Sequence, residues 1–307
     1  MKLLSRTEFL GVVFALSTLP TLTVMAQTLD SAAKLPVVAS FSILGDLTRT
    51  IGGDRVNVRT LVGPDQDAHV FEAKPSDVKT VGAAKMLVSN GLGFDSWMSR
   101  LVQSSGTQAP NVVASAGITP LKEFAEAGKK APIDPHAFQD PSQVMAYVRN
   151  ISAALAKADP AGAVIYQRNA AAYQAELEKL DADLKALYNQ IPLAKRKVIT
   201  SHDAFGYLAA RYQITFLAPQ GLSTESEASA KQVALLIRQV KRENIKALHV
   251  ENMTNPKLLD QLSREAGVTL GANLYADALG AAGSSGDTYL KMMRHNAAEL
   301  VKSMQRN

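Results

Sequence analysis

Apolar positions in residues 160–191 recur at alternating spacings of four and three, the pattern of a long helix that buries one face. They are Tyr166, Ala170, Tyr173, Leu177, Leu180, Leu184, Leu187 and Ile191. Asp159 is a favoured N-cap residue, Pro160 suits the first helical position, and Pro192 ends the pattern. From Tyr166 to Ile191 such a helix spans about 37 Å. Taken alone, the stretch also fits an ordinary surface helix or a short coiled coil, so its flanks decide.

Short apolar, β-prone runs alternate with longer amphipathic segments on both sides of this helix. The runs are residues 37–41, 56–62, 86–89 and 112–114 before it, and 198–200, 214–217, 247–250 and 269–274 after it. Residues 142–157 have helical spacing and lead into the long helix. This alternation predicts an α/β fold with parallel sheets. We expect two (β/α)4-type lobes, residues 27–158 and 193–307, joined by one long rigid helix, residues 159–192, with little motion between the lobes.

The first 26 residues have the three parts of a secretory signal peptide. Lys2 and Arg6 precede an apolar run, and Val24-Met25-Ala26 provides a cleavage site, which we place after Ala26. Polar residues interrupt the run, which argues against a retained membrane anchor. The sequence contains no cysteine, so disulfides, thiolate metal sites and a lipidated N-terminal cysteine are excluded. We therefore expect a soluble periplasmic protein whose metal ligands, if any, are nitrogen and oxygen atoms.

The composition narrows the function without identifying it. The 307 residues are 47% hydrophobic and 20% charged, which is typical of a globular protein, and the length is sufficient for two domains. The net charge is +5. No basic run is longer than Lys129-Lys130, so a nucleic-acid surface is not expected. Gly91-Leu92-Gly93 lacks the third glycine of a dinucleotide fingerprint, since Ser96 stands there. Phosphate-loop, HExxH and GxSxG patterns are also absent, which removes the commonest enzyme classes.

Three histidines and one aspartate follow predicted strands. His69 lies after the second strand, His136 after the fourth, His202 after the first strand of the second lobe, and Asp277 after its last. Ligands bind at the carboxyl ends of parallel strands. Singly, each histidine is more often a solvated or capped loop residue. Together, three imidazoles and one carboxylate in the cleft between the lobes would form a closed nitrogen and oxygen site for a divalent cation.

The other two histidines have different surroundings. His249 lies within a predicted strand, where a hydrogen-bonded core histidine is expected. His295 lies in the C-terminal amphipathic segment between Arg294 and Asn296, and we expect it to be solvated. Neither is assigned to a metal.

The four loops resemble those of the metal-binding class of periplasmic solute-binding proteins, which supply zinc or manganese to ABC transporters. The similar motifs are residues 67–72 (DAHVFE) with 75–77 (PSD), 134–138 (DPHAF) with 140–141 (DP), 200–207 (TSHDAFGY), and Asp277 with 286–289 (GDTY). The resemblance extends from Leu35 to the end of the sequence. Departures are Ala73 in place of proline and Phe138-Gln139 in place of tryptophan and leucine. The segment 122–133 is also short and contains no histidine, whereas zinc-specific relatives often have a long accessory metal-collecting loop there that is rich in histidine and acidic residues.

The resemblance implies a carrier and not an enzyme. The chain would capture a divalent transition metal in the periplasm through His69, His136, His202 and Asp277, and would present it to an ABC-transporter permease. In this family histidine at the third position is commoner in zinc binders, and glutamate there accompanies manganese. Three imidazoles and one carboxylate also suit tetrahedral Zn2+, whereas Mn2+ prefers more oxygen ligands. We therefore expect zinc, although the missing loop weakens that case.

Two alternatives stay open at this point: a manganese carrier of the same family, and a zinc-dependent hydrolase. Four protein ligands argue against the hydrolase, because catalytic zinc usually keeps an open coordination position. The expected partners are the divalent metal ion and the permease, with a periplasmic metal chaperone as a further candidate. No nucleic acid is expected to bind, and the protein is expected to be a monomer.

Overall fold

The structure is a computed structural model that describes residues 33–122 and 131–307. The predicted signal peptide and most of the short loop at 122–133 lie outside the described residues. Within the described residues, none of the helices has the length and apolar character needed to cross a membrane.

The first lobe is built on a four-stranded parallel sheet with strand order β2-β1-β3-β4. Its strands are β1 (Leu35–Phe41), β2 (Val56–Val62), β3 (Met86–Ser89) and β4 (Asn111–Val113). All four were expected from the apolar runs. The central strand β3 is completely buried, and β1 is buried from Val37 to Phe41, as expected of parallel strands covered on both faces.

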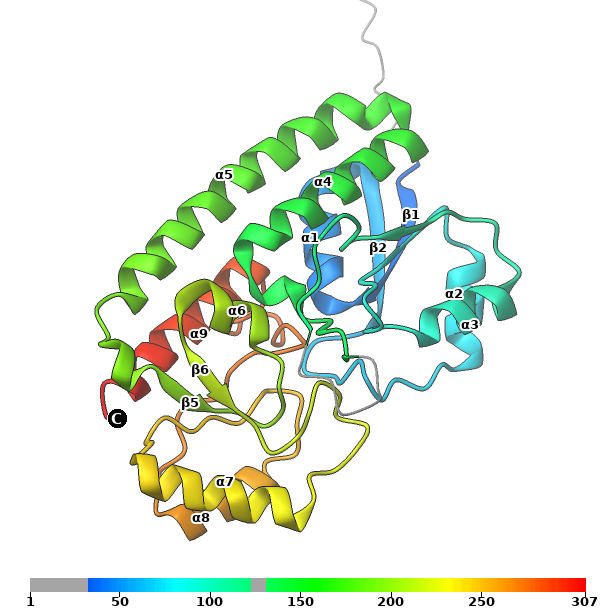
Figure 1. Cartoon of the computed structure of the whole chain (residues 1–307). Helices are drawn as coiled ribbons and strands as arrows, with labels where there is room; N and C mark the ends of the chain where they lie inside the picture. Colours follow the sequence, from blue (N-terminus) through cyan, green and yellow to red (C-terminus); the bar gives the residue numbers. More distant parts are fainter. Residues whose placement is uncertain (1–32, 123–130) are drawn as a thin grey trace, which may run out of the picture. The chain divides into compact units, whose positions relative to one another are not determined.

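Helices cover both faces of this sheet (Figure 1). Helices α1 (Ser42–Gly52) and α4 (Pro141–Ala158) pack together on one face, while α2 (Pro75–Gly82) and α3 (Trp97–Ser105) pack together on the other. Short 3-10 turns follow α1 and precede α4, as η1 (Gly53–Arg55) and η2 (Ala137–Gln139). The helices cover the faces of the sheet, so loops that carry candidate ligands occupy the edge formed by the carboxyl ends of the strands.

The second lobe contains a smaller sheet than predicted. Its strands β5 (Lys197–Ile199) and β6 (Thr215–Leu217) pair in parallel. The runs at 247–250 and 269–274 were predicted as strands but form only single parallel bridges, Ile199 with Leu248 and Glu251 with Leu274. Their apolar side chains still enter the core, which is the signal that the sequence pattern recorded. The parallel α/β class is confirmed, but this sheet has two strands in place of four.

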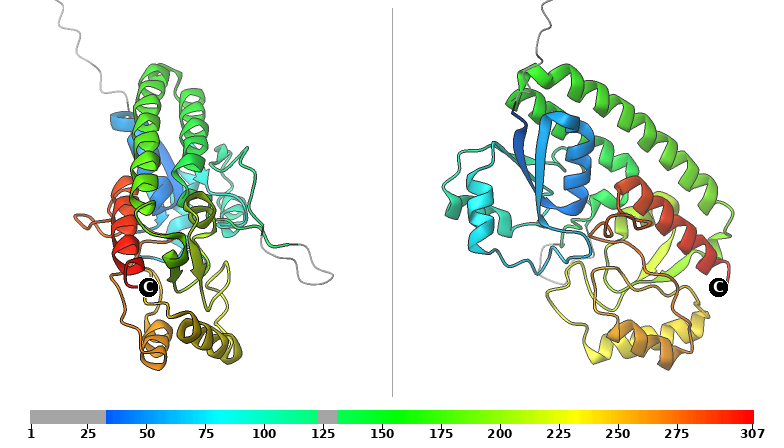
Figure 2. Two further views of the ribbon diagram at one scale, coloured as in Figure 1. Left: turned by 60° about the vertical axis from the view of Figure 1, so that its left-hand side comes forward. Right: turned by 180° about the vertical axis from the view of Figure 1, so that it is seen from behind.

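The helices of the second lobe are α6 (Gly206–Tyr212), α7 (Ala230–Glu243), α8 (Lys257–Ala266) and α9 (Tyr289–Met304). Helices α7 and α8 pack together over a separate apolar core. The C-terminal helix α9 instead contributes its buried face to the main core and packs against α5 and α1. The views in Figure 2 show α9 running beside α5.

The long helix α5 (Ala163–Tyr188) has 26 residues and is about 39 Å long. The 3-10 turn η3 (Pro160–Gly162) precedes it, and η4 (Leu193–Lys195) follows its end. The predicted buried stripe is present from Tyr166 to Leu184. Towards the end of the helix, Tyr188 is buried and Leu187 only partly so. The helix packs along α4 in the first lobe and α9 in the second, so the apolar stripe serves both lobes.

Asp159 does not cap this helix, contrary to the prediction. Its carboxylate accepts hydrogen bonds from Arg55 Nε at 2.7 Å, from Arg55 Nη2 at 2.9 Å and from the Tyr166 hydroxyl at 2.5 Å. A forked guanidinium pair is stronger than a single bond to a backbone amide. The residue therefore fastens the corner between α4 and α5 to the turn after α1.

The two lobes also contact each other directly. The Gln139 side-chain amide donates to the Ala276 carbonyl at 2.7 Å, and the Tyr289 hydroxyl donates to the Phe138 carbonyl at 2.9 Å. The Leu279 amide donates to the Ser42 hydroxyl at 2.9 Å. These contacts agree with limited motion between the lobes, which stays a prediction, as do the lobe boundaries at residues 158 and 193.

Asp181 joins the long helix to α6. Burial by itself raises its pKa, but hydrogen bonds from Arg211, Lys185 and Tyr212 outweigh that effect and lower it to about 2. An unfolded aspartate has a pKa of about 3.9. The carboxylate therefore contributes stability above pH 3.9, and this contribution is lost as the pH falls from 3.9 through 2.

We expect Asp181→Asn to lower the free energy of unfolding at pH 7 by about 2 kcal/mol, because the charged partners lose their acceptor. Urea denaturation of the unmodified protein and of Asp181→Asn measures the difference in the free energy of unfolding. Asp183→Asn is the matched control, since its pair with Lys179 is exposed and is worth less than about 0.5 kcal/mol. Equal losses in the two variants would contradict a special role for Asp181.

Candidate metal centre

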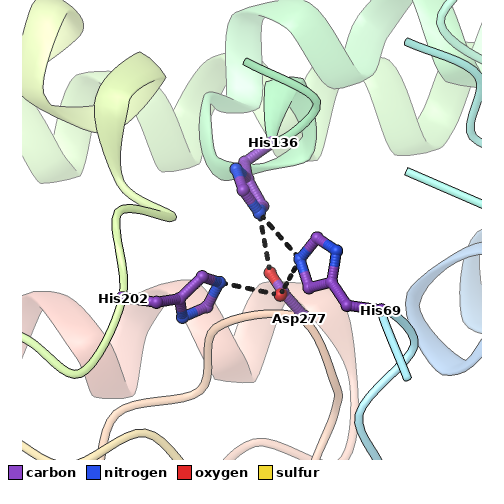
Figure 3. Close-up of side chains that lie close together, drawn as sticks. All are labelled: His69, His136, His202 and Asp277. Carbon is purple, nitrogen blue, oxygen red and sulfur yellow. Dashed lines mark hydrogen bonds and ion pairs between the residues drawn. The ribbon is translucent and has the colours of Figure 1, made fainter. Parts of the chain in front are cut away.

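The four predicted ligands come from four separate segments and meet at one place (Figure 3). His69 lies in the loop between β2 and α2, and His136 directly precedes η2. His202 follows β5, and Asp277 lies between the bridge at Leu274 and α9. Three of these segments leave the carboxyl end of a parallel strand or bridge, whereas His136 lies 23 residues after β4 (Asn111–Val113), just behind the antiparallel bridge of Lys122 with Ile133. The chain nevertheless brings all four side chains together.

The side chains converge through their outer ring nitrogens. His69 Nε2 lies 3.1 Å and His202 Nε2 lies 3.0 Å from Asp277 Oδ2. His136 Nε2 lies 3.6 Å from Asp277 Oδ1 and 3.4 Å from His69 Nε2. One candidate ligand atom of each residue lies within 4.8 Å of all the others. They are near enough together to be candidate ligands of a single cation.

The centre is almost sealed from solvent. His136, His202 and Asp277 are completely buried, and the side chain of His69 is 6% exposed. Asp277 Oδ1 has no hydrogen-bond partner among the described residues. A buried carboxylate oxygen without a partner is costly, and a cation among these four residues would satisfy it.

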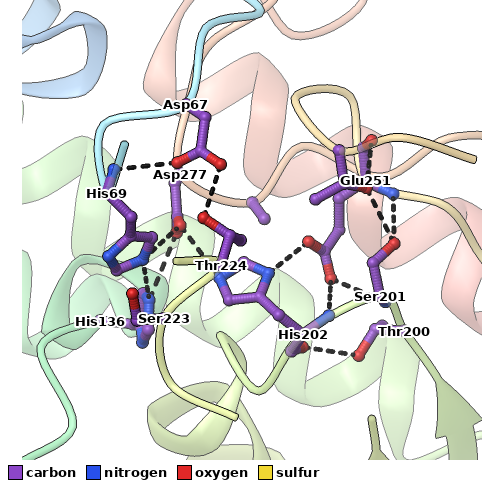
Figure 4. A network of polar contacts seen from close by, with 12 residues as sticks. Asp67, His69, His136, Thr200, Ser201, His202, Ser223, Thr224, Glu251 and Asp277 are labelled. Carbon is purple, nitrogen blue, oxygen red and sulfur yellow. Dashed lines mark hydrogen bonds and ion pairs between the residues drawn. The ribbon is translucent and has the colours of Figure 1, made fainter. Parts of the chain in front are cut away.

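Two further carboxylates contact the histidines, and Figure 4 labels one of them, Glu251. Asp134 Oδ1 accepts from His136 Nδ1 at 2.8 Å, and Glu251 Oε2 accepts from His202 Nδ1. A carboxylate can only accept, so each Nδ1 carries the proton and each Nε2 faces Asp277. No pattern in the sequence indicated a role for Glu251 or Asp134. Asp134 stands in the Asp134-Pro135-His136 motif. Its position two residues before His136 is the only feature of the sequence that could have indicated its contact with this histidine.

Charged neighbours shift the pKa values of His136, His202 and Asp277. Burial lowers the pKa of His136, but Asp277 and Asp134 outweigh burial and raise it to about 9. Burial likewise opposes protonation of His202, yet Glu251 and Asp277 raise its pKa. The same histidines lower the pKa of Asp277, although its burial alone would raise it. Without a cation, protons on the imidazoles therefore balance the Asp277 charge.

The loop that carries His69 is fastened from both sides. Asp67 Oδ1 accepts from the His69 backbone amide at 2.9 Å, and Asp67 Oδ2 accepts from the Thr224 hydroxyl at 2.6 Å. Trp97 Nε1 donates to the Ala68 carbonyl at 2.9 Å. Thr224 lies 157 residues from Asp67, and no sequence pattern indicated this contact between the lobes.

The two remaining histidines lie away from this centre. His249 is completely buried, with Nδ1 2.7 Å from the Ala272 carbonyl and Nε2 2.8 Å from the Ser303 hydroxyl. The prediction of a hydrogen-bonded core histidine is confirmed. His295 is only half-buried, contacts the Asn273 carbonyl at 3.0 Å and packs against the Tyr275 ring.

Two parallel α/β halves that enclose a buried group of three imidazoles and one carboxylate define a class of metal-binding proteins. The family described as "Zinc-uptake complex component A periplasmic" matches residues 37–303. The chain belongs to this family, the periplasmic metal-binding components of ABC transporters.

Individual relatives differ in the metal that their names give. The manganese-binding lipoprotein MntA of Halalkalibacterium halodurans is 32% identical, over 90% of this chain and 91% of its own length. The iron-binding protein YfeA of Yersinia pestis is 31% identical, over 89% of this chain and 87% of its own length. The structure of the periplasmic zinc-binding protein TroA from Treponema pallidum matches with a TM-score of 0.83 and 28% identity, covering 89% of this chain and 99% of that one.

These relatives are named as metal-binding proteins, and the family is that of a metal-uptake component and not of an enzyme. The prediction that the chain is not an enzyme is confirmed, and the zinc-hydrolase alternative is withdrawn. The predicted family and α/β fold are confirmed as well. The names of the relatives include manganese, iron and zinc, so the comparisons leave the metal open.

The raised pKa of His136, about 9, predicts that acid weakens metal binding. Below its pKa each imidazole must lose a proton before it can bind a metal. The apparent affinity should therefore fall about 30-fold between pH 7.5 and 6 for one displaced proton, and about 1,000-fold for two. Chelator competition at several pH values measures this slope. An affinity that stays constant over this range would contradict histidine ligation.

Trp97 offers an optical measure of binding, because it is the only tryptophan in the sequence. Its indole contacts the residue before His69 and packs against Phe71, with ring centroids 4.4 Å apart. We expect a saturable change in tryptophan fluorescence on addition of metal. Its midpoint should match that of direct binding measurements and should disappear in His69→Ala. A change that persists in His69→Ala would show that the fluorescence reports something other than this centre.

Proposed function

We propose that this protein captures a zinc ion with His69, His136, His202 and Asp277 and delivers it to the permease of an ABC transporter. The observation that supports this proposal best is the burial of one carboxylate oxygen without a partner, Asp277 Oδ1, beside three imidazole nitrogens. The ion is the cargo of the protein, so the site has to bind tightly without performing a reaction.

The contacts around Asp277 are compatible with zinc. Tetrahedral Zn2+ has bonds of about 2.0 to 2.1 Å, which places its ligand atoms about 3.3 Å apart. The contacts of Asp277 with His69, His202 and His136 measure 3.1, 3.0 and 3.6 Å. Three nitrogen donors also suit zinc better than manganese, which prefers oxygen.

Manganese is the second candidate for a specific reason. Both Asp277 oxygens face histidine nitrogens, Oδ2 towards His69 and His202 and Oδ1 towards His136. A carboxylate that binds through both oxygens would raise the coordination number above four, which Mn2+ accepts more readily than zinc. The relative MntA is named for manganese.

The proposed location is the periplasm, after removal of residues 1–26. Several relatives are lipoproteins, but the 307 residues of this sequence contain no cysteine to carry such a lipid. A monomeric state and a metal chaperone as an additional partner stay predictions.

Elemental analysis of protein purified without chelators tests the proposal. We expect about one equivalent of zinc in the unmodified protein and loss of most of it in His202→Ala, because three ligands hold the ion far more weakly than four. His295→Ala is the matched control and should retain its zinc, since His295 lies outside the centre. Absence of metal even after addition of excess zinc would overturn the carrier proposal.

A second measurement separates zinc from manganese. Because zinc binds most such sites more tightly whichever metal is physiological, the metal content should be determined on protein recovered directly from the periplasm. Zinc in that sample would support the proposal. Manganese would keep the carrier function and overturn the choice of metal.

A further inference from the structure

Glu251 makes an unusually complete set of contacts with the loop that carries His202. It is 1% exposed and forms the parallel bridge with Leu274. Its Oε1 accepts from the backbone amides of Ser201 at 2.9 Å and His202 at 3.0 Å. Its Oε2 faces His202 Nδ1, as Figure 4 shows. One buried carboxylate therefore holds both the backbone and the ring of a single candidate ligand.

We propose that Glu251 is a positioning residue for metal capture, which keeps His202 protonated at Nδ1 and directs its Nε2 at the ion. The inference rests on the proposed function and assigns this residue a role within it. Glu251 contacts His202 through its backbone amide and Nδ1, and would not itself be a ligand of the ion.

The physical argument concerns the tautomer of the ring. A neutral imidazole carries one proton, and only the nitrogen without it can bind a metal. Because a carboxylate accepts but cannot donate, Glu251 confines that proton to Nδ1. The other tautomer would place an N–H group between His202 and Asp277, where the ion has to bind. A carboxylate behind a histidine also makes the imidazole a stronger donor to the metal.

The three histidines provide an internal comparison. Asp134 contacts the amide and Nδ1 of His136 in the same way, but from two residues away in the same loop. Glu251 acts on His202 from 49 residues away, so only the packing of the second lobe supplies it. In residues 33–122 and 131–307, no carboxylate contacts Nδ1 of His69. The support is therefore specific to two of the three rings.

The decisive variant is Glu251→Gln. Glutamine has the same length, and its carbonyl oxygen can still accept from the Ser201 and His202 amides. Its NH2 group would then face Nδ1 and could only donate, which forces the proton of the ring to Nε2. We expect the zinc affinity, measured by chelator competition, to fall about 10- to 100-fold.

Glu243→Gln is the matched control. It removes the same charge from the same lobe, but its carboxylate pairs with Lys197 away from the centre. We expect its zinc affinity to stay within about twofold of that of the unmodified protein. Glu243 and Lys197 are partly exposed, so solvent and salt screen their charges from the metal centre. An equal loss in both variants would mean that charge alone lowers the affinity, and the positioning role would be overturned.

A spectroscopic measurement separates positioning from a purely structural role. In zinc-loaded protein labelled with 15N-histidine, ring nitrogen shifts distinguish a protonated nitrogen from a metal-bound one. We expect His202 to have a protonated Nδ1 and a metal-bound Nε2, and expect this pattern to change in Glu251→Gln at His202 alone. A structural role would instead disturb all three histidines and lower the melting temperature of the metal-free protein.

Each outcome bears on one proposal. Glu251→Gln with unchanged affinity and an unchanged His202 spectrum would overturn the role of Glu251. If the variant does not fold, the 15N-histidine spectrum of the unmodified zinc-loaded protein provides the test. A His202 without a proton on Nδ1 in that spectrum would also overturn the role of Glu251. A protein that binds no zinc, with Glu251 intact, would overturn the proposed function itself.

Discussion

The structure depends on one constraint, the complete burial of the Asp277 carboxylate between the two lobes. An ionised carboxylate in such a place needs compensating charge or hydrogen bonds. Here the compensation comes from three imidazole nitrogens, which reach Asp277 from both lobes. The neighbouring carboxylates raise the pKa of His136 and His202, which favours protonated imidazoles beside Asp277, and a divalent cation would replace those protons. Metal binding and proton release are thus two descriptions of the same charge balance.

The rest of the fold holds these four side chains in register. The long helix α5 is joined to the first lobe near its start by Arg55, Asp159 and Tyr166, and to α6 of the second lobe by Asp181 and Arg211. Direct hydrogen bonds between the lobes surround the centre as well. A site assembled from four loops depends on these contacts, because displacement of a single loop would change the distances from its ligand atom to the other three.

Behind the ligands, the supporting contacts differ from one histidine to the next. His136 and His202 are each backed by a carboxylate, whereas His69 is held through its backbone amide and the neighbouring Asp67. His69 is also the only one of the four residues with an exposed fraction of its side chain. Relatives with similar sequences are named for manganese, iron and zinc, so membership of the family does not by itself fix the metal.

The sequence by itself determined the elements whose signal is local. Apolar periodicity identified the four strands of the first sheet and the buried stripe of α5, and the position of His69, His136, His202 and Asp277 after predicted strands brought them to one edge. Tertiary structure decided what depends on distant partners. The runs at 247–250 and 269–274 became single bridges because apolar character records burial and not backbone pairing. Asp159 left its expected cap for Arg55, which lies 104 residues away. Glu251 and Thr224 approach the centre only through packing of the second lobe, and no spacing along the chain encodes contacts over 49 and 157 residues.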